Sequence, residues 1–278
     1  MSIVFSASDH SYKSIDGSEN IDWISVTTLI SHLKKAFDAK KVAERVSKSK
    51  RSKWYGLKPE EIEAIWKNEA DRATTLGTYY HNQRETDLCS LASMEREGIT
   101  IPVVVPSGEV NGIRKAPSQK LEPGIYPEHM VYLKSIGICG QSDLVEVVNG
   151  KVNIIDYKTN KEIKTESFID WEGKSEKMLA PVDGLDDCNF NHYALQLSIY
   201  MYIILKHNPK LKPGRIFIHH VTFEEENKDK YGYPIAKLDN EGNPIVKEVI
   251  PMPVPYLVDE VISIIHYLHD NKHKIKKK

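Results

Sequence analysis

The chain has 278 residues, of which 40% are hydrophobic and 28% charged, and its formal net charge is -1. This composition is typical of a folded globular protein and excludes a disordered or fibrous chain. No apolar run approaches the ~20 residues that span a bilayer, and the N-terminal residues do not resemble a targeting segment. We therefore expect a cytoplasmic protein without a membrane partner.

Two further features of the composition exclude classes of cofactor. Cys89, Cys139 and Cys188 are widely spaced, which argues against a disulfide framework, a structural zinc site or an iron–sulfur cluster. The sequence also lacks the glycine-rich phosphate-binding loop that ends in Gly-Lys-Ser or Gly-Lys-Thr, so we expect no bound nucleotide.

Positive charge is concentrated in one stretch near the N-terminus. Nine basic residues lie between positions 34 and 53, against two acidic ones. They are Lys34, Lys35, Lys40, Lys41, Arg45, Lys48, Lys50, Arg51 and Lys53. Because this charge is not balanced locally, we expect the stretch to contact a polyanion. The basic tail at 272–278 is interpreted as a solvated chain end.

Hydrophobic periodicity and turn signals predict helices and strands in one α/β domain over 1–278. Ser25 is predicted to cap the first helix, and Pro59 with the two glutamates after it to open a long one. In chain order, the expected elements are one or two short helices over 25–53, a long helix over 59–91, an irregular connection or small strand pair over 98–124, strands over 125–133, 138–148 and 151–157, a polar excursion over 160–189, a helix over 192–207, a strand over 215–223, a loop or hairpin over 227–243, and a helix over 255–270.

This order favours a central mixed β-sheet flanked by helices. We expect the domain to consist of an N-terminal helical region (1–97), a core (98–223) and a C-terminal part (224–278) with a hairpin or loop, a helix and the basic tail.

The strands over 138–148 and 151–157 carry the most informative residues. Asn149-Gly150 is a strong two-residue hairpin signal, and counting back from this turn places Asp143 opposite Asp156, with Lys158 on the same face as Asp156. Opposed carboxylates repel one another unless a cation compensates them, and Mg²⁺ prefers such oxygen ligands. The alternative is that Lys158 only neutralises one aspartate in a partly buried ion pair.

These residues belong to a larger ordered set that resembles the PD-(D/E)XK nucleases of the RecB-like branch. The set consists of Gly77-x-x-x-His81, Glu128, Gly140-x-x-Asp143, Asp156-Tyr157-Lys158 and Gln196-x-x-x-Tyr200. The stretches 25–29 and 181–205 are similar to single-domain exonucleases of the phage type and the mitochondrial-genome-maintenance type. The resemblance implies a restriction-endonuclease-like core.

The resemblance also implies roles for single residues. The metal ligands would be Asp143, Asp156, His81, Glu128 and the backbone carbonyl of Tyr157, which together hold one or two Mg²⁺ or Mn²⁺ ions. Lys158 would position the nucleophile or offset charge. The DNA-positioning residues would be Gln196, Tyr200, Gly77 and the basic residues of 34–53. Gln196 would hold the active-site geometry or the scissile strand, and Tyr200 would contact phosphate or stack on a base. Gly77 would permit close approach of a helix or of the DNA backbone.

In isolation, two of these residues have simpler interpretations, His81 as a surface or core histidine and Glu128 as a partner of a lysine. With the whole set, we expect a metal-dependent deoxyribonuclease. The resemblance favours an exonuclease that acts on DNA ends with a single-strand preference, in a bacterium or a phage-infected cell, with replication or recombination proteins as partners. A structure-specific or sequence-specific endonuclease and a non-catalytic nucleic-acid-binding module are the alternatives. The acidic segment 170–187 is interpreted as a solvated loop that could also mimic DNA or gate the DNA-binding groove.

Overall fold

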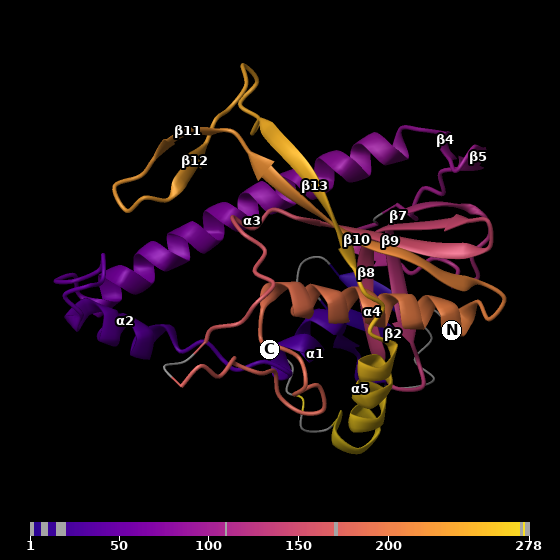
Figure 1. Ribbon diagram of the computed structural model, residues 1–278. Coiled ribbons are helices and arrows are strands. Elements are labelled where there is room, and N and C mark those ends of the chain that lie inside the picture. The colour runs from indigo at the N-terminus through magenta and orange to yellow at the C-terminus, as the bar shows by residue number, and fades with distance from the viewer. Residues whose placement is uncertain are drawn as a thin grey trace.

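The computed structural model describes residues 3–6, 11–14, 21–108, 110–169, 172–272 and 275. Its central feature is a six-stranded mixed sheet (Figure 1). The strands are β3 (Ile24–Ser25), β7 (Gly124–Leu133), β8 (Ile138–Val148), β9 (Lys151–Lys158), β10 (Lys212–Phe223) and β13 (Val246–Val254). They follow the order β13-β10-β9-β8, with β7 and β3 both paired to β8. The predicted α/β fold with a central mixed sheet is confirmed.

Strand β8 changes its neighbour partway along its length. The hairpin register is the predicted one, from Val148 opposite Lys151 to Leu144 opposite Ile155, where the β8–β9 ladder stops. At its other end β8 pairs in parallel with β3, at Ile138 and Cys139. Strand β9 continues beside β10 as far as Lys158. The sheet therefore opens between β8 and β9 next to Asp143.

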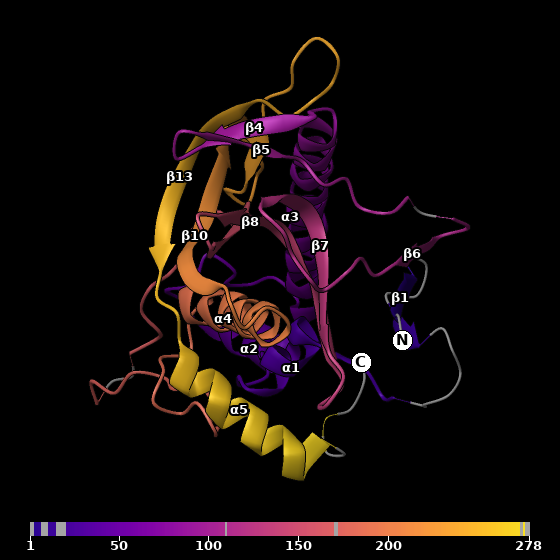
Figure 2. The same ribbon diagram turned by 90° about the vertical axis from the view of Figure 1, so that its right-hand side faces the viewer.

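Helices cover both faces of this sheet (Figure 2). Strand residues 145, 147, 152 and 154 belong to the main core with helices α1 (Val26–His32), α4 (Asn189–His207) and α5 (Val258–Asn271). Their strand neighbours Leu144 and Val148 pack instead against Leu88 of helix α3 (Pro59–Cys89). Because successive strand residues point to opposite faces, α4 and α3 lie on opposite sides of the sheet.

Most predicted elements are present with shifted ends. Ser25 caps α1, since its hydroxyl accepts a hydrogen bond from the Thr28 N–H at 3.0 Å, and α3 begins at Pro59. The 98–124 stretch holds β5 (Ile99–Pro102), which pairs with β4 (Ser93–Arg96), and β6 (Ile113–Lys115). The N-terminal region also contains β1 (Ile3–Ser6) and β2 (Ser11–Ser14), which form a small sheet with β6.

Strand β13 was not among the expected elements. Its prolines, Pro251 and Pro253, weaken a strand signal because proline has no N–H for a sheet ladder. In the structure β13 pairs with β10 alone, at the edge of the sheet. Prolines are tolerated there because no further strand needs their N–H groups.

A small separate core holds one end of α3 to two other elements. Helix α2 (Ala39–Lys48), the beginning of α3 and the hairpin of β11 (Glu225–Lys228) and β12 (Pro234–Ala236) form what we call the arm (Figure 1). Its core consists of Ala43, Trp54 and Ile62, with Val46, Leu57, Ile65, Trp66, Tyr231 and Tyr233 packed around them. Helix α3 thus bridges the arm and the sheet.

The described part of the chain contains no helix with both the length and the apolar character needed to cross a membrane. Asp170 of the acidic segment and residues 273, 274 and 276–278 of the basic tail lie outside the described residues.

Candidate active site

Three side chains with metal-ligating atoms meet where the sheet opens. They are His81 from α3, Glu128 from β7 and Asp143 from β8, and their ligand atoms all lie within 4.8 Å of one another. Carboxylate oxygens and an imidazole nitrogen are suitable ligands for a hard or borderline divalent cation such as Mg²⁺ or Mn²⁺. The donor set therefore fits the metal site that was predicted from the sequence.

The backbone at Glu128 has an uncommon conformation. Pro127 pairs with Leu144 and His129 with Ser142, so Glu128 lies opposite Asp143, yet this position makes no ladder pair. Its φ is 48°, a left-handed value that non-glycine residues rarely adopt and that is more frequent at functional sites. The Gln141 side-chain amide donates a hydrogen bond of 2.6 Å to the Glu128 carboxylate. Strand β7 thus departs from regular geometry at Glu128, the residue that supplies the second carboxylate of the cluster.

His81 reaches the site because α3 lies close to the end of β9. A Cβ atom at Gly77 would lie 3.1 Å from Thr159 Oγ1, so a glycine fits this contact best. His81 Nε2 is 3.1 Å from the Tyr157 backbone carbonyl oxygen, and Nδ1 is 3.4 Å from Asp143 Oδ2. The close-approach role predicted for Gly77 corresponds to a helix–sheet contact, and the Tyr157 carbonyl lies beside the ligand cluster.

Asp156 and Lys158 form a second, more deeply buried group. Asp156 is 1% exposed and its carboxylate forms an ion pair with the Lys158 ammonium. The Lys158 Nζ atom lies 5.0 Å from the centre of the Tyr193 ring and 3.4 Å from the Tyr157 carbonyl oxygen. Asp156 is therefore not one of the three clustered ligands. The ion pair of Lys158 with one aspartate, which was the alternative in the sequence, is present. Asp143 clusters with His81 and Glu128 rather than with Asp156, and the strand ladder stops before the two aspartates would pair.

Asp143 connects the two groups. Its Oδ2 atom accepts a hydrogen bond of 2.8 Å from the Tyr157 N–H, beyond the last ladder pair of β8 and β9. The Tyr157 N–H thus bonds to a side-chain oxygen of Asp143 where a regular ladder would offer a backbone carbonyl of β8. This bond holds the Asp143 carboxylate at the point where β8 and β9 separate. This bond also fixes the peptide between Asp156 and Tyr157.

Burial and mutual charge determine how the site ionises. Burial raises the pKa of Glu128 to about 8, and the negative charge of Asp143 adds to this effect. Burial also raises the pKa of Asp156 to about 6, against the opposing charge of Lys158. Burial by itself lowers the pKa of His81, but the hydrogen bond and charge of Asp143 outweigh it and raise it to about 9. Burial opposes ionisation of Asp143, but the bond from His81 and the charge of Lys158 prevail and lower its pKa.

These pKa shifts favour protons on two of the candidate ligands, and a cation would have to displace these protons. In the absence of metal, the raised pKa values of Glu128 and His81 favour their protonated forms at neutral pH, and the lowered pKa of Asp143 favours its ionised form. A bound divalent cation requires deprotonated ligands, so its binding would release protons and strengthen as the pH rises.

Gln196 and Tyr200 lie one turn apart on α4, as predicted, but Tyr200 is in the core. It is 2% exposed, and its hydroxyl accepts a hydrogen bond of 3.1 Å from the Gln196 amide. A Cβ atom at Gly140 would lie 2.6 Å from the Tyr200 ring. The direct DNA contact predicted for Tyr200 is therefore wrong for this structure, because its ring is packed against β8 three residues before Asp143. Tyr200 therefore contacts the site region through the Gly140 backbone and the Gln196 side chain.

A pocket of about 490 Å³ lies between α3 and the end of β9, and His81 is the member of the cluster that lines it. Its lining includes His81 and Lys158, together with Thr159 and Asn160, which directly follow β9. The Tyr193 hydroxyl donates a hydrogen bond of 2.7 Å to the Asn160 side chain. No role was predicted for Thr159, Asn160 or Tyr193. The adjacency of Thr159 and Asn160 to Lys158 was a signal for two of them, whereas Tyr193 lies in an apolar helix and gave no such signal.

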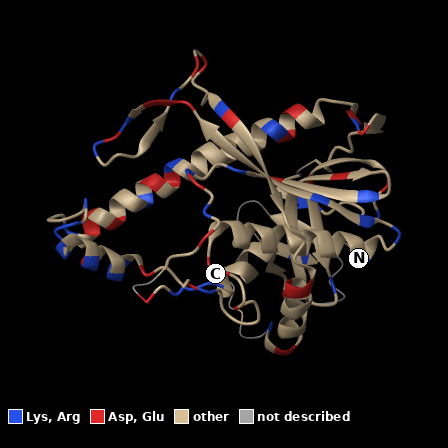
Figure 3. Cartoon of the chain, viewed as in Figure 1, with Lys and Arg blue, Asp and Glu red and all other residues tan. Residues whose placement is uncertain are grey.

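The predicted basic contacts lie in the arm and in the chain leading into it (Figure 3). Lys40, Lys41, Arg45 and Lys48 are exposed on α2, Lys35 precedes it, and Lys50, Arg51 and Lys53 follow it, all exposed, while Lys34 is half-buried. Two of them already have partners. Lys35 forms an ion pair with Glu176 at 3.1 Å, and Lys53 donates to the Tyr231 carbonyl at 2.9 Å. The remaining charges on α2 face solvent.

Among the comparisons with known proteins, a family model gives the match that identifies the superfamily. A comparison with curated proteins found no match. Among solved structures, one described as "Crystal structure of SSO0001" is similar, with 12% sequence identity and a TM-score of 0.33 over 95% of this chain and 81% of that chain. A similarity of this degree is too weak to support an argument. The family model of the PD-(D/E)XK nuclease superfamily, whose members are nucleases that use divalent metals, matches residues 27–251. The chain therefore belongs to the PD-(D/E)XK nuclease superfamily.

Proposed function

We propose that this protein is a Mg²⁺-dependent or Mn²⁺-dependent deoxyribonuclease that removes nucleotides from the ends of single DNA strands. The observation that carries this proposal is the cluster of His81, Glu128 and Asp143 beside the buried Asp156–Lys158 pair, at the mouth of an open pocket. The preference for ends and for single strands rests on the resemblance to single-domain exonucleases.

His81, Glu128 and Asp143 would hold the cation, with the Tyr157 carbonyl within reach and Asp156 behind it. A divalent cation supplies Lewis-acid stabilisation of the phosphodiester and lowers the pKa of a water molecule. The protein then has to keep the carboxylates together against their mutual repulsion. The left-handed backbone at Glu128 and the Tyr157 N–H bond to Asp143 do this.

Lys158 would act as a fixed positive charge. Burial by itself lowers the pKa of Lys158, but Asp156 and Asp143 outweigh this and hold it above its usual value. The ammonium therefore stays protonated at neutral pH and can stabilise charge that develops on the phosphate, rather than act as a base. The Asp156 carboxylate and the Tyr193 ring hold it in place.

The arm would bind the DNA backbone without reading its sequence. Its exposed lysines and Arg45 present point charges from a helix, and contacts of this kind go to phosphates and carry no base information. The proposed substrate is therefore defined by its backbone and its free end.

Strand cleavage tests this proposal. Linear single strands labelled at the 5′ or the 3′ end, a circular single strand and a linear duplex are incubated with Mg²⁺, Mn²⁺ or EDTA. Wild type is compared with Lys158→Ala and with Lys164→Ala, a matched control at an exposed lysine of the following loop. We expect metal-dependent loss of the linear single strands in wild type and control, absent in Lys158→Ala.

The other outcomes have different meanings. Cutting of the circle would replace the exonuclease by an endonuclease of the same fold. Equal activity of Lys158→Ala and wild type would refute the assigned site. Inertness of every sample, with DNA still bound, would favour the non-catalytic binding module.

A further inference from the structure

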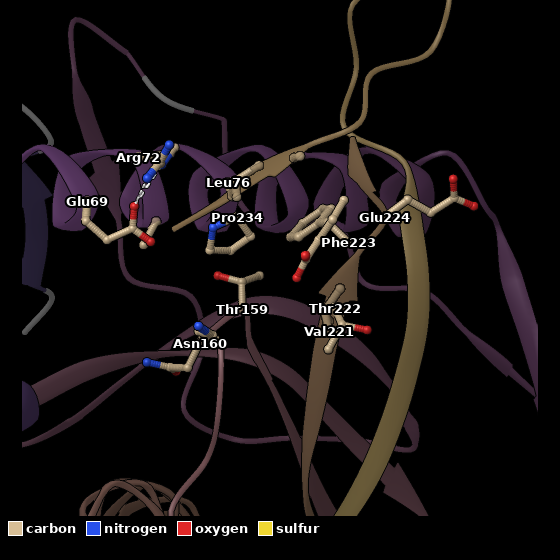
Figure 4. Close-up of a pocket in the computed structure, with 14 residues that line it drawn as sticks. Glu69, Arg72, Leu76, Thr159, Asn160, Val221, Thr222, Phe223, Glu224 and Pro234 are labelled. Atoms are coloured by element: carbon tan, nitrogen blue, oxygen red, sulfur yellow. Dashed lines mark hydrogen bonds and ion pairs between the residues drawn. The ribbon is translucent and has the colours of Figure 1, made fainter. Parts of the chain in front are cut away.

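A second, smaller pocket lies beside the candidate active site, and we call it the side pocket. It has a volume of about 130 Å³ and lies between α3, the end of β10 and the β11–β12 hairpin. Its apolar walls are formed by Leu76, Val221, Phe223, Pro234 and Ala236. In Figure 4, Leu76 and Pro234 face Thr159 and Asn160 across this space, with Phe223 at one side.

The side pocket adjoins the larger pocket that His81 and Lys158 line. Ala73, Thr159 and Asn160 line both of them. The close contact of Gly77 with Thr159 lies between the two pockets, since Leu76 lines one and Gly77 the other. The side pocket therefore begins one residue after Lys158, next to the candidate active site.

The wall formed by the hairpin is tied to α3 by charged groups. Arg72 Nε donates a hydrogen bond of 2.8 Å to Glu69, and the same guanidinium is 3.4 Å from an Asp229 carboxylate oxygen. Glu69 and Arg72 both lie at the rim of the side pocket. The pocket walls are thus joined by interactions within the protein, and the cavity is not formed by one loose loop.

The size and the lining of the side pocket select the kind of group that fits. Pockets for drug-sized ligands usually have about 300–1,000 Å³, so a cavity of about 130 Å³ suits one small, flat group. Aromatic and apolar walls stack on the face of a nucleobase, whatever its identity. Polar side chains at Thr159, Asn160 and Thr222 offer partners for the edge of a base.

We propose that the side pocket binds the nucleobase of the nucleotide next to the scissile phosphate, with the base unpaired. This inference rests on the proposed function and extends it. A paired base carries its partner with it, and the pair is too large for this cavity, so the base must leave a duplex or come from a single strand. Occupation of the side pocket therefore provides a physical reason for a single-strand preference.

The test uses short single-stranded oligonucleotides in which one nucleotide is replaced by an abasic residue, moved one position at a time along the strand. Cleavage is measured with Mn²⁺, and binding is measured separately with EDTA by fluorescence anisotropy. Stacking of one base is worth about 1–3 kcal/mol, or about 5-fold to 150-fold. We expect a loss in this range when the abasic residue occupies one particular position, and little loss elsewhere.

Two variants assign this effect to the side pocket. Phe223 is partly buried and packs against the cluster of Tyr80, Tyr157 and Val221. Phe223→Leu keeps an apolar side chain there but removes the aromatic face. Ala236→Leu fills the cavity and removes no contact. In both variants, the intact oligonucleotide and the one that is abasic at the sensitive position should be cleaved and bound about equally, so the ratio of their cleavage rates and of their affinities should fall to about 1. Phe168→Ala, at an aromatic residue that is 73% exposed and does not line the pocket, is the matched control and should keep the ratio.

Failure of the side pocket is distinguishable from failure of the nuclease proposal. A wild-type protein that cleaves or binds every abasic oligonucleotide equally well overturns the side-pocket inference, as do variants that keep the wild-type ratio. A protein that does not cleave, but binds with one sensitive position that both variants abolish, supports the side pocket and refutes the nuclease. Absence of any DNA binding refutes both.

Discussion

The candidate active site and the arm lie along the same helix, α3, but they place charge in contrasting ways. At the active site His81, Glu128, Asp143, Asp156 and Lys158 are buried or half-buried and lie against one another. In the arm the charged residues of α2 are exposed, and an aromatic core anchors them from beneath.

This contrast follows from what each region has to do. A cation site needs ligand atoms held close together, so the fold has to overcome desolvation and repulsion at particular atoms. Binding a DNA backbone needs only accessible positive charge, which is exposed at little cost and is screened by salt. We therefore expect the active site to respond sharply to single substitutions and the arm to respond gradually to several.

The largest expected effect comes from removing one charge at the active site. Asp143→Asn keeps the shape of the side chain but loses its charge, and Lys158→Ala removes the fixed cation. Each should lower the single-turnover rate of cleavage by about 10³-fold, in the range seen when one electrostatic contact to a transition state is lost. Asp183→Asn, at an exposed aspartate, is the control. A loss below about tenfold in both variants would mean that the reaction takes place elsewhere.

The next effect is on stability and concerns His129, the neighbour of Glu128 in β7. Burial lowers the pKa of His129 from 6.5 to about 4, and within the described residues its Nε2 atom has no hydrogen-bond partner. The unfolded chain binds a proton here below about pH 6.5 while the folded chain does not. The contribution of His129 to the free energy of unfolding should therefore be fully present above pH 6.5. It should be lost as the pH drops to about 4, which lowers the free energy of unfolding by up to about 3 kcal/mol.

Urea unfolding of wild type and His129→Phe between pH 7 and pH 4, with EDTA present, measures this contribution as a difference. The wild type should lose stability relative to the variant as the pH falls. The control is His269→Gln, because the His269 side chain is 83% exposed. A stability difference between wild type and His129→Phe that does not change with pH would contradict the prediction.

Packing behind the active site gives a third test. Gly140→Ala places a Cβ atom 2.6 Å from the Tyr200 ring, and overpacking of this kind costs about 1–3 kcal/mol. Because Gly140 lies three residues before Asp143, cleavage should fall as well. Adding Tyr200→Leu to Gly140→Ala should restore part of the stability. Gly184→Ala, where a Cβ atom meets nothing within 4 Å, should have no effect, and an equal loss in both alanine variants would refute the packing argument.

The smallest effects are expected in the arm. A triple variant, Lys40→Gln, Lys41→Gln and Arg45→Gln, should raise KM for DNA much more than it lowers kcat. It should also reduce the slope of log affinity against log salt concentration by up to about 2, since each phosphate contact on a single strand contributes about 0.7. The control removes three exposed lysines beyond the arm, at Lys206, Lys210 and Lys212. If this control changes the slope equally, the arm is not the DNA-binding surface.

Local chemistry in the sequence determined much of the fold around the active site. The Asn149-Gly150 turn determines the register of β8 and β9, because a two-residue hairpin allows one pairing. The cap at Ser25 and the start of α3 at Pro59 also depend on residues within one helical turn. The alternation of apolar residues likewise indicated a sheet with helices on its faces, as observed.

Tertiary structure alone decided the features that depend on distant segments. Strand β8 pairs with β9 at one end and with β3 at the other, and the sheet opens at Asp143 between these two pairings. The residues that pair between β3 and β8 are more than one hundred positions apart in the chain. The left-handed backbone at Glu128, the packing of Tyr200 on Gly140 and the edge position of β13 all depend on which surfaces meet. Such contacts leave no local pattern, because propensity and periodicity reflect only neighbours along the chain, whereas burial and charge pairing are set by neighbours in space.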